Sequence, residues 1–236
     1  MKENEVLSTM KDLLQARDKL CARCYDETIL ILRNAVQRIS PLVSSESCDE
    51  DSFTDKDEPA LTLTVESFDL SASFDDNQIL QGLESYAIYG NALSLPVSEC
   101  LIHSATRPQD LSVALSATLL YNLALALHLR GLQYTTRSQE VSLRNASRIY
   151  TMAMTIVEGY QQAFDLPLLS MAIAYNLGHI RMLIGENKDS VDQCLDVLRY
   201  SLQSPECELN DLYVFFHMNV VLHDSGYYQR TIAAAA

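Results

Sequence analysis

Apolar residues follow a helical period over the N-terminal part of the chain. Met10 and Leu13, for example, fall on one helix face. The pattern predicts helical structure over residues 1–39, as one long helix or a helical pair with a break near Tyr25. Pro41 is expected to end it, because proline disfavours the helical conformation of the residue before it.

The same period returns in the C-terminal half of the chain, where residues suited to helix ends mark the limits of each segment. Asp110 is a favoured N-cap residue, and Pro167 suits the first turn of a helix. Gly131 and Gly185 suit the position after a helix end. The five helices that this pattern predicts are about 110–129, 139–164, 167–185, 189–202 and 209–224.

The segment near 60–95 carries a different pattern. Residues 60–70 alternate between apolar and polar side chains, which indicates a strand with one buried face. Residues 86–95 are ambiguous, because Ile88-Tyr89 and Ala92-Leu93 fit one helix face but also fit a strand. One interpretation is a small β-hairpin of 60–70 with 86–95. The other is the second helix of an earlier repeat.

Residues 44–59 hold seven acidic residues, one lysine and four serines, with no periodic apolar pattern. Such a composition cannot bury enough apolar surface to order the chain. We interpret it as an acidic disordered linker. It would join an N-terminal helical segment, residues 1–43, to a helical domain over residues 60–236.

The composition favours a mainly α protein. Hydrophobic residues make up 48% of the 236 residues, whereas Gly (7) and Pro (6), which break helices, are scarce. The net charge of −14 would repel phosphate groups, so no nucleic acid and no membrane is expected as a partner. Six scattered cysteines and a charged N-terminus without a signal-peptide core predict an intracellular protein, cytoplasmic or nuclear.

One apolar stretch, Leu111–Leu129, is nearly long enough to span a membrane and carries no formal charge. Its counterpart over residues 166–184 contains Arg181, which would be costly in lipid. Two equivalent helices should share an environment, so we interpret both as helices buried on most sides within a helical array.

A short sequence, Tyr-Asn-Leu, occurs at residues 121–123 and again at residues 175–177. A glycine follows each copy at the same distance, Gly131 in the first and Gly185 in the second. Recurrence of this kind on helices is the signature of a helical repeat. A partial third copy is centred on Asn219.

The second copy resembles the tetratricopeptide repeat, a helix pair whose first helix carries Leu-Gly and whose turn carries a further glycine. Leu177-Gly178 and Gly185 match this pattern. In the first copy the second helix matches best, with a small residue at Ala146 and an aromatic residue at Tyr150. The resemblance covers about residues 85–225.

The first copy departs from the family in its spacing. Gly131 and Ala146 lie further apart than the family requires, so an insertion of about residues 132–140 is expected in the turn. The sequences LLYNLALALHLRG and IYTMAM, on either side of this insertion, also resemble tetratricopeptide-like proteins of diatoms. That group has no known activity, so this second resemblance implies a fold only.

The resemblance implies an α-solenoid of antiparallel helix pairs, whose inner helices line a concave face. In the family, Asn on an inner helix holds the backbone or the terminal carboxylate of a bound peptide. The carboxylate mode also needs a basic residue four positions before the Asn, where this chain has Thr118, Ala172 and Phe215. The peptide-binding residues that the pattern predicts are Tyr121, Asn122, Leu125, His128, Tyr175, Asn176, His179 and Met182.

These eight residues have a second interpretation. The asparagines would then bond within the array, and the N-terminal helices would bury the neighbouring Tyr, His and Met side chains and fill the groove themselves. Such a protein would have no open peptide site.

The sequence contains little that would support metal binding, phosphate binding or catalysis. Cys21 and Cys24 form a lone CxxC with no second pair for zinc, and on a helix both thiols would pack on one face. The five histidines show no metal-binding spacing, and the glycines form no phosphate-binding loop. We therefore expect no enzyme activity, no cofactor and no metal.

Together these patterns predict a non-catalytic interaction scaffold or adaptor that binds a peptide segment of an unknown protein partner on the concave face. One alternative is a small-ligand binder or enzyme with a pocket between the N-terminal helices and the array. Another is a divergent protein whose groove is closed by its own chain. The sequence leaves the oligomeric state open.

Overall fold

The structure is a computed structural model that describes residues 3–44, 66–68, 89–90, 92–94, 108–133, 137–160, 166–203 and 211–224. The helices are α1 (Glu3–Cys21), α2 (Tyr25–Ser44), α5 (Pro108–Gln133), α6 (Arg137–Gly159), α7 (Pro167–Leu183), α8 (Lys188–Ser201) and α9 (Asp211–Asp224). The strands are β1 (Glu66–Phe68) and β2 (Ala92–Ser94). The prediction of a mainly helical protein is thus confirmed. The predicted linker, residues 44–59, lies outside the described residues except for Ser44.

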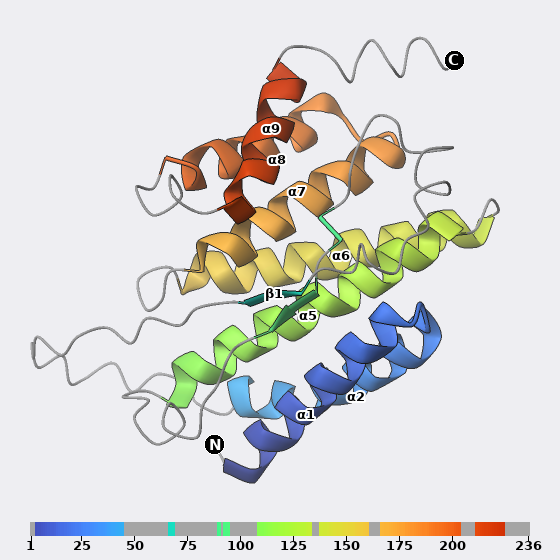
Figure 1. Ribbon diagram of the computed structural model, residues 1–236, viewed down its shortest axis with the longest axis vertical. Helices are drawn as coiled ribbons and strands as arrows, with labels where there is room; N and C mark the ends of the chain where they lie inside the picture. The colour runs from blue at the N-terminus through green and yellow to red at the C-terminus, as the bar shows by residue number, and fades with distance from the viewer. Residues whose placement is uncertain are drawn as a thin grey trace, which may run out of the picture.

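The helices lie side by side in chain order, from α1 and α2 at one end of the molecule to α8 and α9 at the other (Figure 1). Each helix packs against the helix that precedes it in the chain. The predicted break near Tyr25 is confirmed, because α2 begins at that residue. α5 and α6 each begin two residues earlier than predicted. α5 begins at Pro108 and not at Asp110, and α6 begins at Arg137 and not at Gln139.

The turn between α1 and α2 contains the CxxC motif. Cys21 ends α1, and the backbone N–H of Cys24 donates to the carbonyl of Lys19, two residues before the helix end, at 2.9 Å. Arg23 lies between them in the left-handed region with φ 57°, as is usual after a helix end. The two cysteines therefore lie at either end of a turn. The prediction that both thiols pack on one helix face is wrong.

The expected end of the second helix at Pro41 is wrong, because α2 continues to Ser44. A proline inside a helix removes one N–H donor and displaces the carbonyl four residues earlier. Only the last turn follows Pro41, so little of the helix depends on the lost hydrogen bond.

α5 is the central helix of the fold, with α2 on one side and α6 on the other. Its residues Leu111–Gln133 are long and apolar enough to cross a membrane, and the whole of the apolar window is buried inside the protein. Arg130 near its C-terminal end joins the three helices. The guanidinium pairs with Asp26 of α2 at 2.7 Å and donates to Ser142 of α6 at 3.2 Å.

The prediction that an insertion of about residues 132–140 lies in the turn after α5 is wrong. α5 runs to Gln133 and α6 starts at Arg137, so the additional residues lengthen the two helices. Gly131 lies inside α5, where a Cβ would stand 3.1 Å from the side chain of Leu143. A glycine there lets the two helices approach closely.

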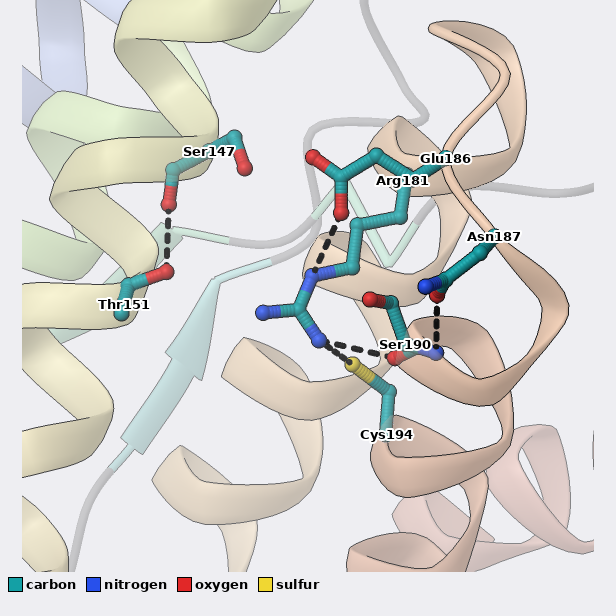
Figure 2. Close-up of polar contacts among 7 residues, drawn as sticks. All are labelled: Ser147, Thr151, Arg181, Glu186, Asn187, Ser190 and Cys194. Atoms are coloured by element: carbon teal, nitrogen blue, oxygen red, sulfur yellow. Dashed lines mark hydrogen bonds and ion pairs between the residues drawn. The ribbon is translucent and has the colours of Figure 1, made fainter.

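α7 and α8 form a tight pair whose turn is held by Arg181 (Figure 2). Its guanidinium donates to the carbonyl of Ser190 at 2.8 Å and to the Cys194 sulfur at 3.3 Å, and it pairs with Glu186 at 3.4 Å. A Cβ at Gly178 would stand 3.3 Å from the Cβ of Cys194. The small residue of the Leu-Gly motif therefore lies where the two helices touch.

The two strands pair antiparallel, with Ser67 opposite Leu93. This pairing confirms the hairpin interpretation, over a shorter stretch than 60–70 with 86–95. The alternative interpretation, a second helix containing Ala92-Leu93, is wrong. The backbone of Ala92–Ser94 is extended, and its hydrogen-bonding partners are β1 and, as described below, the side chain of Asn122.

We expect Gly185→Ala to lower the free energy of unfolding by about 1 kcal/mol, since Gly185 ends α7 with φ +71° and a Cβ is unfavourable in that region. Gly159→Ala is the matched control. Neither glycine has an atom within 4 Å of its added Cβ, and only Gly185 has a positive φ. Urea unfolding followed by circular dichroism measures both. Equal effects would show that the φ of Gly185 does not limit stability.

Candidate functional site: two asparagines that hold an extended segment

Asn122 of α5 holds the backbone of Leu93 by two hydrogen bonds. The Leu93 N–H donates to Asn122 Oδ1 at 3.0 Å, and Asn122 Nδ2 donates to the Leu93 carbonyl at 2.7 Å. The same Nδ2 also donates to the carbonyl of Thr118 one turn earlier, at 3.1 Å. We refer to such a reciprocal pair of hydrogen bonds between one amide side chain and one backbone residue as an amide clamp.

Asn176 of α7 forms a second amide clamp, on Tyr89. The Tyr89 N–H donates to Asn176 Oδ1 at 3.1 Å, and Asn176 Nδ2 donates to the Tyr89 carbonyl, also at 3.1 Å. Two phenols complete this site. Tyr121 donates to the Tyr89 carbonyl at 3.3 Å, and Tyr150 accepts from Asn176 Nδ2 at 3.1 Å. Burial raises the pKa of both phenols well above the usual range, so they stay neutral.

An asparagine side chain presents one acceptor and one donor group in the arrangement of a peptide unit. It can therefore pair with the N–H and C=O of one residue as a neighbouring strand would. Leu93 and Tyr89 are four residues apart, so an extended chain presents the backbone groups of both at the same edge. The two copies of Tyr-Asn-Leu thus place equivalent amides on Tyr89 and Leu93. We refer to residues 89–90 and 92–94, the described residues of this stretch, as segment 89–94.

The side chains of Tyr89, Ala92 and Leu93 are buried. The Tyr89 ring lies 4.7 Å from the ring of Phe216 and 5.5 Å from that of Phe215, both on α9. Tyr175 of α7 stands edge-on to Phe215 at 5.1 Å. Leu93 is 2% exposed, so both ends of the segment are held by backbone clamps and by packing.

The eight residues predicted to bind a peptide lie together on α5 and α7, and we call them the groove residues. Seven are buried and Met182 is half-buried. The expected open concave face is therefore covered, and both asparagine clamps are filled by segment 89–94. The N-terminal helices were the other expected occupant. α2 packs against α5, where Asp26 pairs with Arg130, whereas the two asparagines bond to segment 89–94.

Two of the groove residues, His128 of α5 and His179 of α7, form a buried pair. His128 Nε2 and His179 Nδ1 are 3.0 Å apart, so one nitrogen donates and the other accepts. Burial lowers the pKa of His179 to about 4, and burial with the neighbouring His179 lowers the pKa of His128 well below its usual value. Both rings are neutral at physiological pH, and the pair links α5 to α7.

A small hollow of about 250 Å³, including its part open to solvent, lies between α7, α8 and α9. Mostly apolar side chains line it, together with His179, Cys194 and His223. It does not lie between the N-terminal helices and the later helices, where the alternative interpretation placed a small-ligand pocket. Among the described residues, no group of three or more His, Cys, Asp or Glu side chains could hold a metal ion.

Sequence reasoning missed the residues on the other side of the site. Tyr89 and Leu93 occupy the clamps, and Phe215 and Phe216 surround the Tyr89 ring. The strand pattern of 86–95 was a visible signal, but it does not say which helix such a strand contacts. The partner of Tyr175 is likewise a tertiary contact: its phenol donates to Asn219 Oδ1 at 2.9 Å.

No protein family, no curated protein and no solved structure compared with this chain matches it. The function must therefore be argued from the geometry of the groove residues and of segment 89–94.

The buried histidine pair predicts a loss of stability in acid. The folded-state pKa values lie below the unfolded value of 6.5, so the unfolded chain binds more protons as pH falls from about 6.5 toward about 4. We expect the free energy of unfolding to fall by about 2 to 4 kcal/mol between about pH 7 and about pH 5. Urea unfolding at each pH measures this.

The variant His128→Gln/His179→Gln removes the titrating groups, so its stability should change less over the same pH range. His217→Gln is the control, because His217 is exposed on α9 and should keep the full dependence. An equal slope for wild type and the double variant would contradict the assignment.

We expect Tyr150→Phe to lower the free energy of unfolding by about 1 kcal/mol, because it removes a buried acceptor of Asn176 without removing the ring. Tyr200→Phe is the control, since Tyr200 is 75% exposed and should change stability by less than about 0.5 kcal/mol. Both are measured by urea unfolding at neutral pH. If the two variants were equally stable, the Tyr150 hydrogen bond would contribute nothing.

Proposed function

We propose that this protein is a tetratricopeptide-like α-solenoid that acts as a non-catalytic adaptor, binding an extended segment of a protein partner along α5 and α7. The observation that carries the proposal is the pair of amide clamps. Asn122 and Asn176 each exchange two hydrogen bonds with one residue of an extended backbone. They lie at equivalent positions of the two repeats.

The chemistry of the clamps suits recognition of a peptide. Amide clamps bind backbone groups, which every residue except proline presents, so they favour an extended conformation over any particular sequence. Pockets for alternate side chains then supply specificity, as in other modes of peptide recognition. In this protein the ring-lined site at Phe215 and Phe216 is such a pocket.

The helix packing supports the repeat architecture. Consecutive helices pack in pairs, and the glycine of the Leu177-Gly178 motif lies at the contact between α7 and α8. Gly185, which matches the turn glycine of the family, follows α7 in the left-handed conformation. Asn219 extends the series of asparagines to α9, where it accepts from Tyr175.

A self-closed groove is the competing interpretation, and segment 89–94 is the observation that favours it. In that case the two asparagines serve only to bury the chain's own backbone. The two interpretations differ in one consequence. An adaptor binds a partner through Asn122 and Asn176, whereas a self-closed protein binds no partner there.

Affinity capture followed by mass spectrometry tests the adaptor proposal. The baits are the full chain, the variant Asn122→Leu/Asn176→Leu, and Asn145→Leu as a matched control on the partly exposed side of α6. Each bait must first show the same helical circular dichroism, with the single variants used where the double variant unfolds. We expect a partner that the wild type and the control capture and that the groove variant loses.

The captured partner would then be divided into overlapping peptides to locate the bound segment. A partner list that is the same for all three baits would contradict the proposal. Any captured partner would then bind to another surface of the chain.

A further inference from the structure

The extended chain that fills both amide clamps belongs to the protein itself. We infer that segment 89–94 is an internal ligand, which closes the groove until it is displaced by a partner segment carrying an aromatic residue followed four positions later by leucine. This inference rests on the proposed function, and it adds the sequence class of the partner and the way in which binding is controlled.

The first anchor is the aromatic ring. Tyr89 is 4% exposed, and its ring packs against Phe216 at 4.7 Å and Phe215 at 5.5 Å. Tyr175 stands edge-on to both phenylalanine rings, at 5.1 and 6.0 Å. Tilted and edge-on rings at these distances attract each other beyond the burial of their area. The pocket therefore selects an aromatic side chain at the residue that Asn176 holds.

The second anchor is an aliphatic side chain at the residue that Asn122 holds. Leu93 is 2% exposed, and its neighbour Ala92 is 1% exposed. Side chains of an extended chain alternate between two faces, so residues four apart return to the same face. The spacing of the two clamps thus fixes the pattern of the partner: an aromatic residue, followed three positions later by a small residue and four positions later by leucine.

The internal segment holds its place by contacts that a second chain can reproduce. The four clamp hydrogen bonds involve only the N–H and C=O groups of Tyr89 and Leu93. On the other edge the segment pairs with β1, which has three residues. A two-stranded ribbon of this size is marginal in water, so β1 alone does not retain the segment.

Competition within one chain sets the affinity for the partner. A tethered segment has a high effective concentration at the groove, so it is bound most of the time. The apparent affinity of an external segment falls in proportion to the fraction of molecules in which the groove is open. Weakening segment 89–94 should therefore tighten the binding of an external peptide without changing any residue of the groove.

A fluorescent peptide with the sequence of residues 87–96, AIYGNALSLP, tests the inference on the full chain. The segment variant is Tyr89→Ala/Leu93→Pro, which removes the ring and one N–H donor and leaves the groove residues unchanged. We expect the peptide to bind this variant about tenfold or more tightly than the wild type, by fluorescence anisotropy. Adding Asn122→Leu to the segment variant should abolish binding, and adding Asn145→Leu should not.

The peptide supplies its own control, because replacing its tyrosine by alanine removes the first anchor and should weaken binding about tenfold or more. Equal affinity for the wild type and the segment variant would overturn the internal-ligand inference and leave the adaptor proposal standing. No binding to a folded segment variant would overturn both. Binding that survives Asn122→Leu would place the peptide elsewhere and overturn the inference.

Folding of the segment variant is checked by circular dichroism, with Tyr89→Ala alone as the milder substitution. If both variants lose their helical signal, segment 89–94 is an obligatory part of the core and the inference is wrong. Partner capture through Asn122 and Asn176 would remain an independent test of the adaptor proposal.

Discussion

Burial of an extended backbone is the constraint on which this structure depends. A strand that lies against apolar helices must find partners for its N–H and C=O groups, because each unpaired buried group costs about 1 to 3 kcal/mol. β1 serves one edge of segment 89–94, and Asn122 and Asn176 serve the other. An aliphatic residue at either asparagine would leave two backbone groups of the segment without those partners.

The buried polar side chains have a second effect, because they join neighbouring helices at defined positions. The Tyr150 phenol reaches from α6 to Asn176 of α7, and the histidine pair links α5 to α7. Hydrogen bonds are directional, whereas the burial of apolar surface is not. The apolar surfaces of these helices alone would be compatible with several alignments. The buried hydrogen-bond network therefore selects one of them.

The two copies of Tyr-Asn-Leu have unequal surroundings in this fold. α5 is covered by α2 and α6 and by the sheet, whereas α7 is flanked by α6, α8 and α9. The two clamps accordingly hold different residues, Leu93 at α5 and Tyr89 at α7. If the groove takes a partner as we propose, this inequality gives the bound segment a direction and a sequence preference that two identical repeats could not supply.

The sequence by itself determined the helices, because periodic apolar positions and capping residues such as Pro167 and Gly185 act locally. It also singled out Asn122 and Asn176, since their repetition is visible without a structure. Only the tertiary structure decided what those amides hold. Tyr89 and Leu93 are distant from them in the chain, and an amide accepts any extended backbone equally well. The choice was made by the aromatic pocket on α9 and the packing of Leu93, which exist only after the helices have assembled.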